Sequence, residues 1–421
     1  MQKPVGDCRK PYRLSIDFPS MVKVTMATAN PISDITSASA PPGAGLLVLL
    51  AAMPPEQLES LLANLAASFP EEDLLVATPD ENAADSHPDL RIVPAPATKS
   101  SWELTAADFV NAYHLAGKNE ARAILMLGPE SSSLAPSALR DLANAVIATS
   151  TDLAIPRYDL PPHAALVNSA ILYPLSRALF ASRARFPMAI DLGLSLRMVE
   201  RLASAAQRFA PPSQGEVLLW PINEAAVAGF TIDEFDVGPR VLPQPEGPGL
   251  NTIFPMVTGS LFADIDAKAA FWQRPRLLPP AHYSTPPAPS TDPARDIAPM
   301  LEAFRLAYDN LQDIWRLVLP PKSLLGLKRL SVANAAAFHL PESLWARIVF
   351  DFLLAYRLRT INRGHLLGAL IPLYLAWVAS HINITASGTS PARHIEAVAA
   401  AFEADKPYLV SRWRWPDRFN P

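Results

Sequence analysis

The sequence of 421 residues contains one cysteine, Cys8, and only 16 glycines against 44 prolines. A single cysteine excludes an intrachain disulfide and a thiolate metal site, and it fits a reducing compartment, so we expect a cytoplasmic protein. No run of Lys or Arg makes a basic stripe, and 36 basic against 40 acidic residues leave a net charge of −4. This balance argues against nucleic acid as a partner.

Long apolar runs are also missing. The longest uncharged apolar stretch, 366–380, contains Pro372 and is shorter than the roughly 20 residues that span a bilayer. We therefore predict a buried helix there and no transmembrane segment. The first 44 residues are polar and Pro-rich, without the apolar region of a secretory signal.

Motifs of two common enzyme classes are absent as well. The eight histidines show no H-x-x-x-H or H-E-x-x-H spacing, so a zinc site is not expected. Ser131, Ser132 and Ser133 form no G-x-S-x-G elbow, so the sequence does not indicate a hydrolase.

What is present is an alternation of apolar runs and helical patterns. We predict strands and helices in turn, joined by short connections, which favours an α/β fold with a mostly parallel, Rossmann-like sheet. The predicted strands are Leu46–Ala52, Leu74–Ala77, Arg91–Val93, Ala123–Leu127 and Asp152–Pro156. The predicted helices begin at Pro55 or lie near Phe109–Leu115, Pro136–Ala148, Leu166–Phe180 and Leu194–Phe209.

Proline marks the boundary between two parts of the chain. Seven prolines fall between Pro275 and Pro293, and beyond them the apolar residues repeat at helical spacing, as from Trp345 to Tyr356. We predict a disordered tail (1–44), a sheet domain (45–275), a Pro-rich linker (276–293) and an α-helical C-terminal region (294–421).

Ordered segments between about 120 and 415 resemble a known family. They are Asp152–Tyr158, Arg185–Ser195, Ala225–Phe262, Trp345–Phe352 and Lys406–Trp413. In this order they are similar to family-2-like bacterial GT-A glycosyltransferases related to glucosyl-3-phosphoglycerate synthase and mannosylglycerate synthase. The resemblance implies a GT-A-like fold and retaining transfer of sugar from a nucleotide-diphospho-sugar to a small polar acceptor. It also implies a divalent cation, Mg²⁺ or Mn²⁺, on the diphosphate.

The chain departs from the family where that cation should bind. An Asp-x-Asp motif is expected after the fourth strand, but Leu127 is followed by Gly128-Pro129-Glu130. Leu242 stands where the family has a ligating His, and Leu218 replaces an acid before Trp220. Glu130 is therefore the one candidate metal ligand at this strand end, with a solvated loop residue as the alternative.

The resemblance also indicates polar residues for the remaining subsites. Asp191 is the catalytic candidate, with a carboxylate at a helix N-terminus as the alternative. Asp80 is the candidate for the nucleotide base, or a simple turn residue. Arg157 and Arg240 are candidates for the phosphates, or members of structural ion pairs.

Two functions stay open on this sequence. The first is a glycosyltransferase that uses a nucleotide-sugar and a small polar acceptor. The second is a catalytically inactive descendant that keeps the fold and acts as a binding or scaffolding protein, which the joint loss of Asp-x-Asp, His and acid favours. A membrane-bound polymerising synthase is disfavoured, since no spanning segment is predicted, and homo-oligomerisation is left open.

Overall fold

The computed structural model describes residues 45–69, 73–80, 83, 87–97, 103–148, 150–242, 249–278 and 296–416. All of these described residues belong to one compact unit. The predicted tail (1–44) lies outside the described residues, and so does the predicted linker after residue 278.

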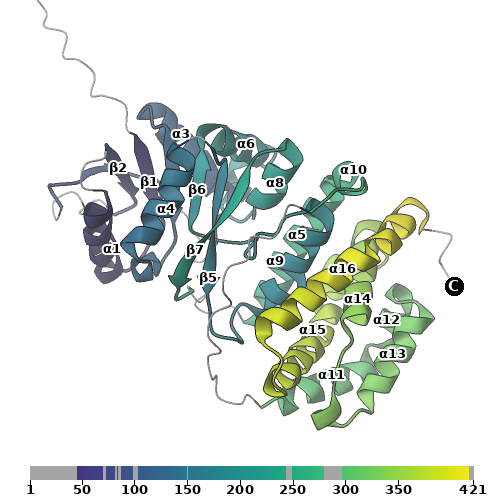
Figure 1. The fold of residues 1–421 in the computed structure, drawn as a ribbon. Coiled ribbons are helices and arrows are strands. Elements are labelled where there is room, and N and C mark those ends of the chain that lie inside the picture. Colours follow the sequence, from purple (N-terminus) through teal and green to yellow (C-terminus); the bar gives the residue numbers. More distant parts are fainter. Residues whose placement is uncertain are drawn as a thin grey trace, which may run out of the picture. The chain divides into compact units, whose positions relative to one another are not determined.

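A seven-stranded sheet organises the first half of the described chain (Figure 1). The strand order is β3-β2-β1-β4-β6-β5-β7, and every neighbouring pair is parallel except those that involve β6. The sheet is therefore mostly parallel, as predicted. Its strands are β1 (Leu46–Leu50), β2 (Leu74–Thr78), β3 (Arg91–Pro94), β4 (Ala123–Leu127), β5 (Leu153–Asp159), β6 (Leu192–Ser195) and β7 (Ile232–Pro239).

Helices cover this sheet and bury its central strands. Every residue of β1, β2 and β4 is buried, as expected for parallel strands covered on both faces. Helix α1 packs beside α4, and α3 packs beside α6. The helices of this half are α1 (Pro55–Ser68), α3 (Ala106–Lys118), α4 (Pro136–Ile147), α5 (Tyr173–Phe180), α6 (Leu196–Ala206), α7 (Pro211–Gln214), α8 (Pro221–Ala228), α9 (Leu250–Ala267) and α10 (Ala269–Trp272).

Local sequence fixes where several helices begin. Proline occupies the first turn of α1 and α4, where no backbone donor is needed. Thr105 and Asp108 form a capping box at the start of α3. The Ser195 hydroxyl accepts from the Met198 N–H at the start of α6. The predicted helix start at Leu194 is wrong, because Leu194 and Ser195 belong to β6.

The second half is helical, as predicted. Its helices are α11 (Ala298–Asn310), α12 (Gln312–Val318), α13 (Pro321–Ser331), α14 (Glu342–Leu358), α15 (Arg363–Ala386) and α16 (Pro391–Arg414). Their core also takes in α5 and α9, which come from the sheet half of the sequence. The Trp345 indole donates to the Ala170 carbonyl at 2.8 Å, and Arg177 pairs with Glu396 and Glu403.

One described helix, α15, is long and apolar enough to cross a membrane, and 72% of its most apolar window is buried inside the protein. By length and composition this is weak evidence for a membrane span, because the core helix of a globular domain has the same features.

A pair of buried histidines joins α15 to α16. The Nδ1 atoms of His381 and His394 lie 2.7 Å apart, so one ring must donate and the other accept. Burial lowers the pKa of His381 to about 3 and also lowers that of His394. Both rings are therefore neutral in the folded state at neutral pH.

We predict that this pair makes the fold sensitive to acid. A buried histidine with a lowered pKa stabilises the fold fully above its ordinary pKa of about 6.5, and this contribution declines as the pH falls toward the folded pKa. At pH 5, protonation of His381 in the unfolded state should lower the free energy of unfolding by about 2 kcal/mol. Urea unfolding of wild type and His381→Phe at pH 7.5 and pH 5 should show a smaller pH-dependent loss in the variant.

Burial also raises the pKa of Glu234 and of Asp351 to about 7, so these groups add their own pH dependence to the free energy of unfolding. The contribution of His381 is therefore measured as the difference in pH dependence between wild type and variant. His365→Gln, at an exposed position on α15, is the matched control and should follow the wild type. Equal pH dependence in all three proteins would contradict the assignment.

Candidate functional site

The chain crosses the sheet at β1, which makes this strand the switch point of the topology. From β1 it continues to β2 and β3 on one side and then returns to β4 on the other. Open α/β sheets bind ligands outside the carboxyl ends of the strands at such a point. A ligand-binding site is therefore expected at the loops that follow β1, β2 and β4.

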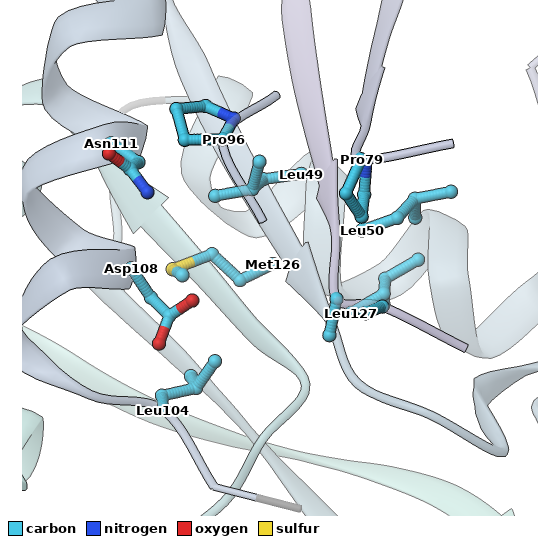
Figure 2. Close-up of a pocket in the computed structure, with 11 residues that line it drawn as sticks. Leu49, Leu50, Pro79, Pro96, Leu104, Asp108, Asn111, Met126 and Leu127 are labelled. Atoms are coloured by element: carbon cyan, nitrogen blue, oxygen red, sulfur yellow. The ribbon is translucent and has the colours of Figure 1, made fainter. Parts of the chain in front are cut away.

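A small crevice lies at this place (Figure 2). Its walls are mostly apolar and come from the ends of β1 and β4, from loop residues after β1, β2 and β3, and from α3 with the residue Leu104 before it. Asn111 and Asp108 supply polar side chains from α3. The other lining residues are Leu49, Leu50, Ala51, Ala52, Pro79, Pro96, Leu104, Met126 and Leu127.

The two polar side chains of the crevice differ in their bonding. Asp108 accepts hydrogen bonds from the Thr105 backbone N–H at 2.7 Å and from the Thr105 hydroxyl at 2.8 Å, so it is part of the helix cap. No hydrogen bond joins the Asn111 carboxamide to a described residue. Asn111 is therefore the side chain best placed to bind a ligand there. Sequence reasoning missed it, because nothing in the α3 pattern distinguishes it from a surface residue.

The turn after β4 brings Glu130 against α1. The Gln57 amide donates to the Glu130 carboxylate at 2.5 Å, and the Glu130 N–H donates back to Gln57 at 3.2 Å. Glu130 adopts the left-handed conformation, with φ of 63°. Gly128 has no room for a side chain, since a Cβ there would lie 2.6 Å from Ile190. The turn is thus fixed by contacts on both sides.

Asp191 lies next to this turn and is completely buried. Strand β6 runs antiparallel to β4, with Leu192 opposite Met126, which sets Asp191 beside Gly128. Its carboxylate accepts from the Gly128 N–H at 3.1 Å and from the Tyr158 hydroxyl at 2.8 Å. The alternative interpretation of Asp191 as a helix N-terminal carboxylate is wrong, because a strand follows it and these groups bind it.

Arg240 completes the network around Asp191. Its Nε lies 2.9 Å from an Asp191 oxygen, and both side chains are 0% exposed. The remaining guanidinium nitrogens donate to the Pro129 and Val241 carbonyls at 2.7 and 2.5 Å. Burial alone would lower the pKa of Arg240, but the Asp191 carboxylate raises it. Each nitrogen of this predicted phosphate ligand is thus already used inside the protein.

Tyr158 is held in its protonated form by the same network. Burial and the Asp191 carboxylate raise the pKa of its hydroxyl well above the ordinary value. It is therefore protonated at neutral pH and donates its hydrogen bond to Asp191.

Arg157 and Asp80 do not join this network. Arg157 precedes Tyr158 in β5, so its side chain points to the other face of the sheet, where it forms a two-point ion pair with Asp236 on β7. Asp80 lies two residues after β2, directly after the crevice residue Pro79, and its N–H donates to the Thr78 hydroxyl at 3.3 Å. Ion pairing, the alternative left open for both arginines, describes how the structure holds Arg157 and Arg240.

The residues at the end of β4 do not fit a divalent cation. Mg²⁺ and Mn²⁺ need several oxygen ligands with free lone pairs. Glu130 binds Gln57, and Asp191 binds three donor groups inside the protein. Across the described ranges, no three His, Cys, Asp or Glu residues gather as a metal site would require.

Comparison with protein-family models and with curated proteins gives no match. Among solved structures, the chain is similar to glucosyl-3-phosphoglycerate synthase from Mycobacterium tuberculosis. Against its complex with phosphoglyceric acid, identity is 12% over 56% of this chain and 82% of that chain, with a TM-score of 0.35. Against its complex with Mn²⁺, uridine-diphosphate and phosphoglyceric acid, identity is 11% over 53% and 78%, with a TM-score of 0.38. Similarity at this level concerns the fold, and no residue role follows from it.

We predict that Asp191→Asn destabilises the protein strongly. The substitution leaves the buried Arg240 charge without its counter-charge, which typically costs about 3–5 kcal/mol. Asp236→Asn is the matched control, because it breaks a similar ion pair whose acid is 61% exposed, where the cost is about 1 kcal/mol or less. Denaturant unfolding of the three proteins gives the comparison, and equal losses in the two variants would refute the argument.

We also predict that the protein without nucleotide binds Mn²⁺ weakly. Calorimetric titration should give no saturable heat, and Glu130→Gln should not change the trace, because Glu130 already bonds to Gln57. Tight binding that Glu130→Gln abolishes would show that the turn opens to form a cation site.

Proposed function

We propose that this chain is a glycosyltransferase that binds a nucleotide-diphospho-sugar in the crevice at the carboxyl ends of β1, β2 and β4. The observation that carries the proposal is the position of this crevice at the switch point of the sheet. The sequence resemblance to GT-A glycosyltransferases supports it independently. The acceptor is a small polar molecule, transfer retains the anomeric configuration, and the setting is the cytoplasm.

The crevice suits the nucleoside part of such a donor. Leucine and proline side chains offer flat apolar contact to a base, and the Asn111 carboxamide can both donate and accept a hydrogen bond. The small residues Ala51 and Ala52 leave the backbone after β1 open to close approach by a ligand. Asp80, one residue beyond the crevice wall, stays the proposed contact to the base from the β2 side.

The proposed transfer makes one bond and breaks one. The acceptor oxygen bonds to the anomeric carbon, and the bond from that carbon to the diphosphate breaks. The diphosphate leaves with the bonding electrons, and the acceptor proton is released to it. Because the strand-end carboxylates are already bonded, we propose that this charge is balanced without a pre-bound cation. Arg157 is the proposed phosphate contact, and this role requires its exposed ion pair with Asp236 to open.

Asp191 serves this site as a positioning residue in the proposal. It touches Arg240, Tyr158 and the Gly128 N–H, and these contacts fix the turn from Gly128 to Glu130. That turn borders the crevice through Leu127. Activity would depend on Asp191 through the shape of the turn, and on Arg240 for the same reason.

One observation favours the alternative, a catalytically inactive descendant that binds or scaffolds. The charges of Asp191 and Arg240 satisfy each other in the interior, so neither is available to a substrate. A chain that had exchanged its cation site for a buried ion pair would keep the fold and could still keep the nucleotide crevice.

We predict that the protein binds a nucleotide-sugar without added metal and that Asn111→Ala weakens this binding about tenfold, the value of one lost hydrogen bond. Titrations with UDP-, GDP- and ADP-glucose, each with Mn²⁺ or with EDTA, measure affinity, and release of free nucleotide measures turnover. His114→Ala, an exposed position on the same helix, is the control.

The outcomes separate the two functions. Binding with turnover supports the transferase, and binding without turnover on a range of small polar acceptors supports the inactive descendant. Absence of binding for all three nucleotide-sugars, or binding that Asn111→Ala leaves unchanged, would contradict the proposal that this crevice binds the donor.

A further inference from the structure

Helix α13 carries an exposed face that is cationic and contains no acidic residue. Between Ile314 and Pro341 there are four cations and no Asp or Glu, although the whole sequence has 40 acidic residues and a net charge of −4. Three of these cations, Lys322, Lys328 and Arg329, lie on α13 and are exposed. Within the described residues, none of the three takes part in an ion pair.

Apolar side chains lie between these cations. Leu325 is 50% exposed and Val332, the residue that ends α13, is 82% exposed. Steps of three, four and seven residues place these two with Lys322, Lys328 and Arg329 on one side of the helix. The opposite side is anchored in the helical core by Leu327 and Leu330. We call the five exposed residues the α13 face, and it lies on an outermost helix in Figure 1.

We propose that the α13 face binds the surface of an anionic lipid bilayer. The arrangement matches an interfacial helix, in which apolar side chains enter the headgroup region and flanking Lys and Arg contact anionic lipid. Long cationic side chains can lie along the apolar boundary while their charges stay in water. The complementary charge of the bilayer selects this partner, since Lys322, Lys328 and Arg329 attract anionic headgroups.

Exposure of leucine alone does not define such a face. Leu306 on α11 is 63% exposed, but the exposed Glu302 and Asp309 lie one helical turn to either side of it. An anionic surface would repel that region. The α13 face is therefore distinguished by the combination of apolar and cationic side chains.

The test is sedimentation of the purified full chain with lipid vesicles. Wild type should bind phosphatidylcholine vesicles that contain about 30% phosphatidylserine, bind pure phosphatidylcholine weakly, and lose binding as salt rises. Each cation near the surface contributes roughly a fivefold factor, so Lys322→Gln, Lys328→Gln and Arg329→Gln together should weaken binding about 100-fold. Leu325→Ser with Val332→Ser should also weaken it.

Matched variants serve as controls. Lys118→Gln, Arg122→Gln and Arg393→Gln remove the same charge from other exposed positions and should change binding by no more than about twofold. Leu306→Ser should leave binding unchanged.

Three results would overturn the proposal. If wild type does not bind anionic vesicles, the α13 face is not a membrane-binding surface. If the control triple variant loses as much vesicle binding as the α13 triple variant, the effect is a nonspecific one of net charge. Self-association in solution that the α13 substitutions abolish would assign the face to a second copy of the chain instead.

Discussion

The buried ion pair of Asp191 and Arg240 is the interaction on which the site depends. Two opposite charges without solvent contact are stable together, but either one alone would be strongly destabilising. The pair ties the start of β6 to the segment after β7 and, through Gly128 and Pro129, to the turn after β4. Three distant parts of the sequence are thus fixed relative to the crevice by one contact.

The same ion pair bears on the absence of an Asp-x-Asp motif at the end of β4, where Gly128-Pro129-Glu130 stands. In a site that holds a divalent ion, carboxylates at the strand end must keep lone pairs free for the metal. Here Glu130 is engaged by Gln57, and Asp191 is engaged by a cation that belongs to the protein. The guanidinium of Arg240 permanently balances the charge of the Asp191 carboxylate. This internal pairing favours rigidity of the turn over a contact that a ligand could complete.

Much of the architecture could be predicted from the sequence because its elements are local. The strand Ala123–Leu127 has the predicted limits, since a short apolar run bounded by Gly128 leaves few alternatives. Helices α1 and α4 begin at the prolines that mark them. The predicted helix starts at Leu194, inside β6, because Leu194 and Ser195 adjoin the strongly amphipathic residues of α6, and only pairing with β4 and β5 makes them a strand. Strand β7 is not predicted from the sequence, because acidic residues separate its apolar residues Ile232, Phe235 and Val237.

Local sequence therefore predicts the alternation of strands and helices, the mostly parallel sheet and the helical second half, and it marks Asp191 and Arg240 only as candidates. The tertiary structure shows which groups those two residues contact. Asp191 and Arg240 are 49 positions apart, and a charge pair at that separation leaves no periodic pattern, because strand order and register bring it together. Likewise Asn111 lines the crevice only because the strand order brings the ends of β1 and β4 and the loop residue Pro79 next to α3. Side-chain partners follow from contacts between elements, and contacts of this range are set by packing, which local sequence does not encode.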